Sequence, residues 1–214
     1  MKPLNLFAAL LGTLLLSTGA GAQTIKDVFA NEETPLFYYG IDFTKFRLID
    51  DATANAEDIV DRQFDGINDL IVNEPKKYDL AGAFRRSTIN HDLSYVSKKN
   101  EKADVNALKS TTTDDFARLT EKDIEATVKG MTTGNQKGVG LLFVAEAASK
   151  SKKAMAVWVT FFDIKTKKVL HTERIEGKLS MAFTFRNQMG TAIKSVIDQV
   201  DKKKYKEWKA KYAG

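Results

Sequence analysis

The chain contains two histidines, His91 and His171, and they are its only imidazole groups. Asp92 follows His91 directly, and Ser87 and Ser94 stand nearby, so an acid, a base and a nucleophile share one short segment. In serine hydrolases such groups meet in space, but close neighbours in sequence seldom form the triad. We therefore interpret His91 as a surface-loop residue and rank a hydrolase as the least favoured function.

The residue types that bind metal ions are spread along the chain without a ligand spacing. His171 lies in a segment of mixed polarity, where we expect cross-strand packing, and it is far from the other histidine. Four aspartates share one side of a predicted helix, which suggests a docking face for a basic partner or a loose cation site: Asp58, Asp61, Asp65 and Asp69. Calcium needs about six to eight oxygens that converge from a turn. We favour a solvated helix face and predict no metal and no cofactor.

The glycine-rich segment Gly134–Gly140 invites comparison with phosphate-binding loops. It lacks the Gly-Lys-Ser/Thr ending of such loops, and the apolar run after it predicts a strand where a phosphate loop leads into a helix. The glycines between Gly130 and Gly140 are typical of turns, so we interpret this segment as a connecting loop.

Lysines and aromatic residues alternate near the carboxyl end of the chain. The lysines are Lys202, Lys203, Lys204, Lys206, Lys209 and Lys211, and the aromatic residues are Tyr205, Trp208 and Tyr212. Basic-aromatic helices can lie on anionic membranes, but the aromatic side chains can equally pack on a sheet while the lysines stay in water. We favour packing; the alternative is a membrane or partner contact through Lys204, Tyr205, Trp208, Lys209 and Tyr212.

The spacing of apolar residues predicts the helices that must position these groups. The first spans Asn55–Val72, with one apolar face made of Ala56, Ile59, Val60, Phe64, Ile67 and Ile71. A second follows Thr120, which resembles a capping box with Asp123. The last spans Phe185–Tyr212, with a buried stripe of Met189, Ile193, Val196, Ile197 and Val200.

Residues 76–119 have the least regular pattern in the chain. We expect Tyr78, Leu80 and Phe84 to line a short helix. Leu93–Val96 is predicted to form a strand and Lys98–Lys102 a charged turn.

Aromatic and β-branched residues predict four strands. Leu36–Ile49 is the first, and Gly40 inside it indicates a bulge or a close backbone contact. Val139–Ala148 and Met155–Ile164 are nearly continuous apolar runs; the second is apolar on both faces, with Val157, Val159 and Phe161 opposite Trp158, Phe162 and Ile164. Val169–Leu179 is more polar and is expected nearer an edge. Short connectors join the last three strands into a meander. The predicted fold is therefore α/β, with a mixed (α+β) sheet, helices packed on it and a long C-terminal helix.

The first 22 residues have the three parts of a secretory signal peptide. Met1–Pro3 carries a positive charge, Leu4–Leu16 is largely apolar, and Ala20-Gly21-Ala22 fits the pattern that signal peptidase accepts. The apolar run is shorter than the roughly 20 residues that span a bilayer. We predict cleavage between Ala22 and Gln23, which leaves residues 23–214 as a single domain in the periplasm or outside the cell.

Composition narrows the classes of function further. The chain has no cysteine, which excludes disulfides, thiolate zinc sites and the lipid-modified cysteine of bacterial lipoproteins. The formal net charge of +5 falls to +4 without Lys2, and this mild excess is spread among many acids. Nucleic-acid-binding proteins carry a strong basic stripe, so we expect no nucleic-acid partner. No later segment is apolar enough to be a transmembrane segment.

The segment Asp163-Ile-Lys-Thr-Lys-Lys-Val-Leu170, together with the order of elements, resembles bacterial envelope proteins with the fold of the TolB amino-terminal domain, CsgG and LpoB. Their strands often continue as Asp-x-x-Thr-Gly-x-x-Leu, and Asp163, Thr166 and Leu170 match. Lys167 replaces the usual glycine, which argues against a tight turn with positive φ. The resemblance implies an interaction domain without a catalytic centre and assigns no functional residue.

We expect an exported, non-enzymatic envelope protein that acts through protein contacts, as an accessory or assembly module. The alternative is a binding module for a small apolar or amphipathic ligand. In that case the aromatic residues of Leu36–Phe46 and Met181–Phe185 would line a pocket. Because aromatic side chains most often fill the core, the first function is favoured.

Overall fold

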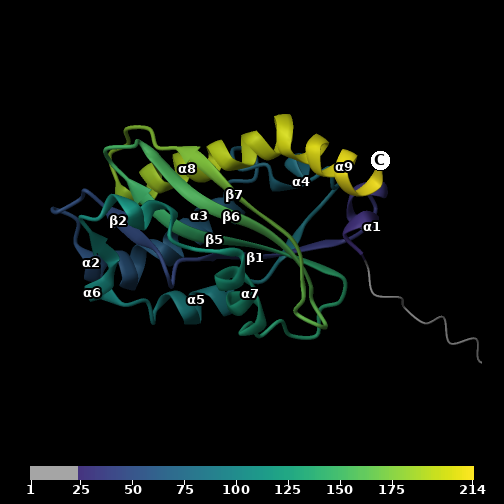
Figure 1. Ribbon diagram of the computed structural model, residues 1–214, viewed down its shortest axis with the longest axis horizontal. Coiled ribbons are helices and arrows are strands. Elements are labelled where there is room, and N and C mark those ends of the chain that lie inside the picture. Colours follow the sequence, from purple (N-terminus) through teal and green to yellow (C-terminus); the bar gives the residue numbers. More distant parts are fainter. Residues whose placement is uncertain (1–23) are drawn as a thin grey trace, which may run out of the picture.

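A seven-stranded mixed sheet forms the middle layer of the protein (Figure 1). The computed structural model describes residues 24–214, so the predicted leader and its cleavage site at Ala22 and Gln23 lie outside the described residues. The strands are β1 (Leu36–Asp42), β2 (Arg47–Ile49), β3 (Asn90–His91), β4 (Lys109–Ser110), β5 (Val139–Ser149), β6 (Ala154–Asp163) and β7 (Val169–Lys178).

Strand β5 lies at the centre of the sheet and has partners of both directions. On one side it pairs antiparallel with β6, which pairs antiparallel with β7, so the predicted meander is confirmed. On the other side β1 pairs parallel with the first half of β5 and β2 with the second half. Strands β3 and β4 lie outside β1 and β2. Strand β7 is an edge strand, as its polarity predicted.

The predicted single strand Leu36–Ile49 is two strands, which corrects the sequence interpretation. Asp42 ends β1, and its carboxylate accepts hydrogen bonds from the backbone N–H and the hydroxyl of Thr44, at 2.8 and 2.5 Å. The N–H of Phe46 then donates to the carbonyl of Phe43 at 2.9 Å. An aspartate that satisfies the backbone two residues later forms a turn, and this turn interrupts the strand.

Gly40 lies at the irregularity that was predicted for it. Its φ is +90°, and the register of β1 against β5 shifts between Tyr38 and Ile41. A Cβ at position 40 would lie 2.7 Å from the Asn68 side-chain oxygen. That buried amide accepts from the N–H of Ile41 at 2.7 Å and donates to its carbonyl at 3.0 Å. Asn68 therefore satisfies the backbone groups that the irregular strand leaves without a ladder partner.

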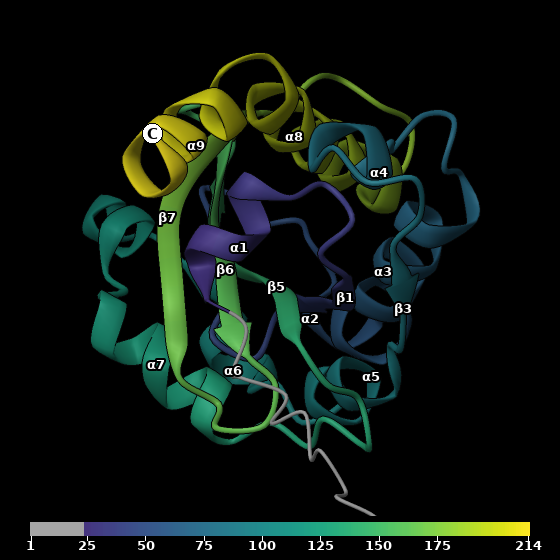
Figure 2. The same ribbon diagram turned by 90° about the vertical axis from the view of Figure 1, so that its right-hand side faces the viewer.

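Helices cover both faces of the sheet, as Figure 2 shows for α8 and α9 on one face and α7 on the other. The first layer contains α1 (Ile25–Ala30), α2 (Ala56–Asp58), α3 (Phe64–Asn73), α4 (Leu80–Ala83), α8 (Phe185–Gln199) and α9 (Tyr205–Ala213). The opposite layer contains α5 (Ser94–Asn100) and α7 (Glu121–Lys129). The remaining turns are α6 (Val105–Leu108), the π-helical η1 (Ile59–Gln63) and η3 (Val200–Lys204), and the 3-10 helix η2 (Thr113–Ala117).

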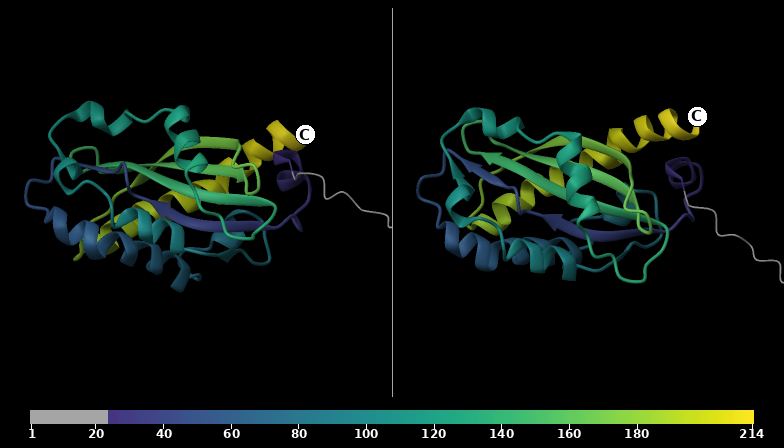
Figure 3. Two further views of the ribbon diagram at one scale, coloured as in Figure 1. Left: turned by 90° about the horizontal axis from the view of Figure 1, so that it is seen from below. Right: turned by 60° about the horizontal axis from the view of Figure 1, so that its bottom comes forward.

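The two layers meet opposite faces of β6, as the alternation of its residues predicted. Val157, Val159 and Phe161 join the core beneath α3 and α8. Trp158, Phe162 and Ile164 join the core beneath α7. The two predicted long helices also form, each with one π-helical turn: α2–η1–α3 and α8–η3–α9. The second crosses the sheet obliquely (Figure 3).

The predicted strand Leu93–Val96 is wrong, because α5 begins at Ser94. The Asp92 carboxylate accepts from the Ser94 N–H at 2.9 Å and so starts the helix. Tyr95 and Val96 are both buried against the sheet. Four residues rich in apolar side chains do not distinguish a buried helix turn from a buried strand. The predicted turn Lys98–Lys102 consequently begins inside α5.

The turn after β6 is tight although it lacks the usual glycine. Lys167 adopts φ +57°, which corrects the expectation drawn from its side chain. The Asp163 carboxylate accepts from the N–H and hydroxyl of Thr166, at 2.6 and 2.7 Å. The Lys167 N–H donates to the Asp163 carbonyl at 2.7 Å. These bonds hold the turn and force lysine into the left-handed region, where a side chain costs about 1 kcal/mol.

Candidate functional site

The structure does not bring His91, Asp92 and the nearby serines together as a triad. No hydrogen bond joins His91 to Ser87, Ser94 or Asp92 within residues 24–214, although His91 and Ser87 line the same pocket. Asp92 faces Ser94 instead, and hydrogen bonds from the Ser94 hydroxyl and N–H hold the pKa of that carboxyl below its usual value. Asp92 is therefore engaged at the start of α5 and does not orient His91.

That pocket has a volume of about 250 Å³ and lies between β1, β3, α3 and α4. Its walls are mainly apolar, with Ile71, Val72, Pro75, Leu80 and Ile89, and its polar groups come from Tyr38, Tyr78, Asp79, Ser87, Thr88 and His91. Of the aromatic segment Leu36–Phe46, only Tyr38 lines it. Tyr39, Phe43 and Phe46 are buried in the cores, as the favoured packing interpretation stated.

The lysine-aromatic helix is docked on β7 by its aromatic residues. Tyr205 and Trp208 are only 4% and 2% exposed. Trp208 donates to the Glu173 carboxylate at 2.5 Å, and the Lys204 ammonium lies 2.7 Å from the same carboxylate. Tyr212 is half-buried. The aromatic side chains therefore pack on the protein, as the favoured interpretation expected. Of the five residues proposed for a membrane or partner contact, only Lys209 is well exposed.

His171 belongs to the same seam between β7 and α9. Its Nδ1 lies 3.0 Å from the Tyr212 hydroxyl, and its ring packs edge-on against Trp208 with the centroids 5.1 Å apart. Burial, with the positive charge of Lys211, lowers the pKa of His171 to about 4. The imidazole is thus neutral at pH 7 and serves as a packed ring. It packs across the ladder on Phe161 of β6, with the centroids 6.1 Å apart, as predicted, and also against α9, which was not predicted.

The four aspartates of the first long helix do not converge. Asp58 pairs with Arg62 and accepts from Gln63 at 2.9 Å, and hydrogen bonds from Gln63 and Arg62 lower the pKa of Asp58. Asp61 and Asp69 are exposed. Within residues 24–214 no group of three or more histidine, aspartate or glutamate side chains is placed to hold a metal ion. The solvated-face interpretation fits this arrangement.

The glycine-rich segment is a loop, as predicted. Gly134 and Gly138 have φ of +61° and +98°, and the Gly138 carbonyl accepts from the Ile164 N–H at 3.0 Å. The loop leads directly into β5.

A buried carboxylate in β5 is the main polar feature that the sequence interpretation missed. Glu146 is 0% exposed and occupies the bulge between Ala145 and Ala147, where β5 has one more residue than β6. It accepts from the Leu119 N–H at 2.5 Å, the Trp158 indole at 3.1 Å and the Arg174 guanidinium at 2.7 Å. A lone glutamate within an apolar run was the available signal. Because all its partners are structural, it holds η2 and α7 onto the sheet.

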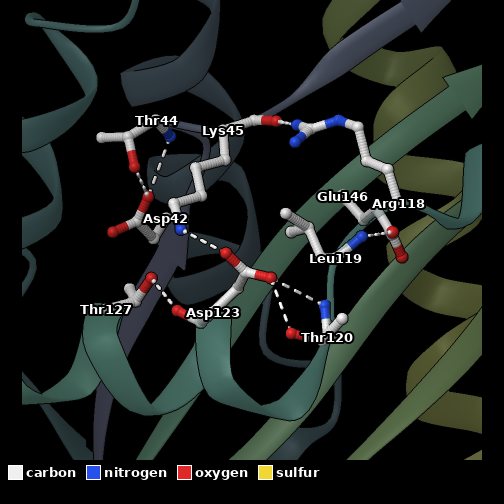
Figure 4. A network of polar contacts seen from close by, with 9 residues as sticks. All are labelled: Asp42, Thr44, Lys45, Arg118, Leu119, Thr120, Asp123, Thr127 and Glu146. Atoms are coloured by element: carbon white, nitrogen blue, oxygen red, sulfur yellow. Dashed lines mark hydrogen bonds and ion pairs between the residues drawn. The ribbon is translucent and has the colours of Figure 1, made fainter. Parts of the chain in front are cut away.

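A second set of polar contacts continues from Glu146 toward the end of β1 (Figure 4). Arg118 donates to the Lys45 carbonyl, and the Lys45 ammonium lies 3.1 Å from Asp123. Hydrogen bonds from Thr120 and Lys45 lower the pKa of Asp123 to about 2. The predicted capping box of Thr120 and Asp123 is confirmed. These contacts fasten α7 to the turn after β1.

The most exposed apolar side chains lie on the loop between β7 and α8. Met181 and Phe183 are fully exposed, and they are the only large hydrophobic residues exposed within the described part of the chain. The loop is held at both ends: Leu179 N–H donates to the Lys153 carbonyl at 2.9 Å, and Thr184 caps α8. The loop therefore presents these two side chains to solvent instead of folding them onto the core. The segment Met181–Phe185, expected to line a pocket, contributes Phe183 and Phe185 to the rim of an open hollow of about 270 Å³ beside Asp51 and Lys150.

Three lysines lie beside the start of this loop, and the ammonium of one of them, Lys152, lies 5.3 Å from the centroid of the Phe116 ring. Lys178 pairs with Ala154 across the ladder, so the turn with Lys152 and Lys153 lies beside it. These three lysines are exposed and form no ion pair with another described residue. We call residues Ser180–Thr184, with Lys152, Lys153 and Lys178, the tip surface. It is the candidate functional site.

A scan against models of protein families finds no match to the chain, and a search of curated protein sequences finds no similar protein.

Proposed function

We propose that the protein is an exported, non-enzymatic module of the bacterial cell envelope, and that it acts by contact through the tip surface. The signal-like leader, the missing cysteine and the resemblance to envelope interaction domains support the location. The polar clusters inside the molecule connect its own elements. Among the residues that the structure describes, the tip surface holds the large apolar side chains that are fully exposed.

The exposure of Met181 and Phe183 carries this proposal. Burying a side chain of this size contributes about 1.5–3 kcal/mol, and the fold forgoes that gain at two positions separated by one residue. Phe185, two residues further, packs against the core instead. An exposed apolar pair on a loop fixed at both ends is typical of a contact surface.

Site-specific cross-linking in cells tests the contact. A photoreactive phenylalanine analogue is placed at position 183 and, as controls, at the exposed positions 125 on α7 and 206 on α9. We expect a discrete cross-linked envelope component from position 183 alone, and its loss in the Met181→Ser background. Equal products from all three positions, or no product from 183 with either protein or lipid, would refute the tip surface as the contact site.

Export is tested separately by cell fractionation and amino-terminal sequencing. We expect the chain outside the cytoplasm with Gln23 as its first residue. An uncut chain in the cytoplasm would refute the predicted location.

The pocket beside β3 supports a second candidate function, the binding of a small amphipathic ligand. Its volume of about 250 Å³ exceeds the roughly 150 Å³ of an apolar cavity that accepts benzene, so a single ring with a polar substituent fits. Phenols and related compounds should raise the unfolding temperature of the protein, and Ile89→Trp should abolish that rise by filling the pocket. A rise that survives Ile89→Trp would exclude this pocket.

A further inference from the structure

The tip surface combines protruding apolar side chains with lysines that lack acidic partners. We propose that it docks on an anionic lipid bilayer, with Met181 and Phe183 entering the headgroup region and the lysines contacting lipid phosphates. This inference rests on the proposed function, because it takes the tip surface to be the contact surface.

The apolar part suits a bilayer in its shape. Met181 and Phe183 stand on a short loop whose ends are fixed by Leu179 and by the cap of α8. Ser180 is also tied to helix α8, since its backbone N–H donates to the Thr191 hydroxyl at 2.9 Å. Isolated protruding side chains need a matching groove on a protein partner, but they enter the lipid interface without one.

The charges select anionic lipid. Each lysine near an anionic surface contributes attraction of about fivefold in affinity, and three such lysines border the loop. Of the neighbouring acids, Asp51 lies 2.8 Å from the Lys150 ammonium, which offsets its charge. Asp50 accepts from the Ser151 hydroxyl at 2.5 Å, a neutral donor, so its carboxylate offsets part, but not all, of the charge of the three lysines. Helix α8 begins at this end without an acid in its first turn, so its positive dipole end adds to the field.

The lysine-rich α9 is the competing membrane surface, and the structure separates it from the tip. Helices α8, η3 and α9 run continuously from Phe185 to Ala213, which places the two ends about 40 Å apart at 1.5 Å per residue. Tyr205 and Trp208 are buried, so α9 offers charge without a strong apolar anchor. Within residues 24–214 no helix is long and apolar enough to cross a membrane.

Fluorescence quenching by brominated lipid tests insertion at the tip. The full chain carrying Phe183→Trp is mixed with vesicles of brominated phosphatidylglycerol or brominated phosphatidylcholine, and Lys206→Trp on α9 is the matched control. The native Trp158 and Trp208 are buried and give a constant background. We expect strong quenching for Phe183→Trp on the anionic vesicles only. No quenching above the control, or equal quenching on both lipids, would overturn the proposal.

Vesicle sedimentation tests the lysines with a charge-matched pair of triple variants. The first replaces Lys152, Lys153 and Lys178 by glutamine, and the second replaces Lys202, Lys203 and Lys206, so both lose the same net charge. We expect the first to weaken binding by about a hundredfold and the second by far less. The reverse order would transfer the membrane surface to α9 and overturn the proposal. Unchanged unfolding midpoints show that both variants fold.

The outcomes also separate this inference from the proposed function. A protein cross-link from position 183 without vesicle binding would overturn the lipid inference and keep the contact surface. Dimerisation of the chain through the tip surface, abolished by Met181→Ser, would likewise overturn the lipid inference and keep the tip as the contact surface. Absence of both vesicle binding and any cross-link from 183 would overturn both.

Discussion

Single residues at irregular backbone positions hold this fold together. Glu146 occupies a β-bulge, Asn68 satisfies the backbone beside Gly40, and Lys167 adopts a left-handed conformation in a tight turn. In each case a polar side chain supplies hydrogen bonds that the regular ladder does not. These positions are sensitive because a buried polar group without its partner costs more than the bond itself contributes.

Replacing Glu146 should be costly for this reason. Glu146→Ala leaves the Arg174 Nε–H, the Trp158 indole and the Leu119 N–H without an acceptor, and we expect the free energy of unfolding to fall by about 3–5 kcal/mol. Glu176→Ala is the control, since Glu176 pairs with the same arginine from a half-exposed site and should cost below about 1 kcal/mol. Chemical denaturation measures both; similar losses would refute a special role for Glu146.

The turn at Lys167 gives a second prediction at this scale. Lys167→Val should lower the free energy of unfolding by about 1–2 kcal/mol, because a β-branched residue resists a φ of +57°. Lys167→Gly relieves the positive φ but also removes the hydrogen bond from the Lys167 ammonium to the Met131 carbonyl, so it should cost less than Lys167→Val. Lys165→Val, in the same turn but without a positive φ, should change stability by less than about 0.5 kcal/mol. Equal effects at both positions would contradict the strained-turn interpretation.

At the scale of elements, the first and last described helices, α1 and α9, meet at the seam between β7 and α9. The ring of Phe29 in α1 packs against Trp208 and stacks on Tyr212, with centroids 6.0 and 5.9 Å apart. His171 is buried beneath the same helix. The first and last helices therefore share one aromatic cluster, and its stability depends on whether that imidazole is charged.

This seam should make stability depend on pH. The pKa of His171 falls from 6.5 in the unfolded chain to about 4 in the fold, so between these values only the unfolded state binds the proton. The free energy of unfolding should drop by roughly 2–3 kcal/mol as the pH decreases from 6.5 to 4. His171→Phe keeps the packed ring and should remove that part of the slope. Parallel pH profiles for the two proteins would contradict this assignment.

An element was predictable from the sequence when its contacts are to residues nearby in the chain, and was missed when its partner is distant in sequence. The β5–β7 meander and the stripe of α8 were predictable because their partners or periods are local. The short strands β3 and β4 escaped because each exists only through pairing with a distant strand. The candidate site was half visible: Met181 and Phe183 were noticed as pocket residues, but their exposure depends on the fixed ends of a loop, which no pattern encodes.

At the scale of the whole molecule, the stabilising core and the tip surface are separate. The two helical layers enclose the sheet, whereas the tip surface extends from one end. Contact and stability can therefore be changed independently.

The double variant Met181→Ser with Phe183→Ser tests this separation. It should keep the free energy of unfolding within about 0.5 kcal/mol of the native value while removing the contact described above. Phe185→Ser should cost more than about 1 kcal/mol, since Phe185 packs against the core. Thermal and denaturant unfolding measure both. A large loss of stability in the double variant would show that the loop is structural.

The parallel pairing of β1 with β5 also has a consequence during synthesis. Leu36 pairs with Val139, which lies 139 − 36 = 103 residues later in the chain. At about 5–20 residues per second, the growing chain exposes the aromatic first strand for roughly 5 to 20 s before its partner exists. Segments of this kind aggregate when left unpaired, so a holding chaperone should raise the yield of this protein, and the benefit should end once β5 has been made.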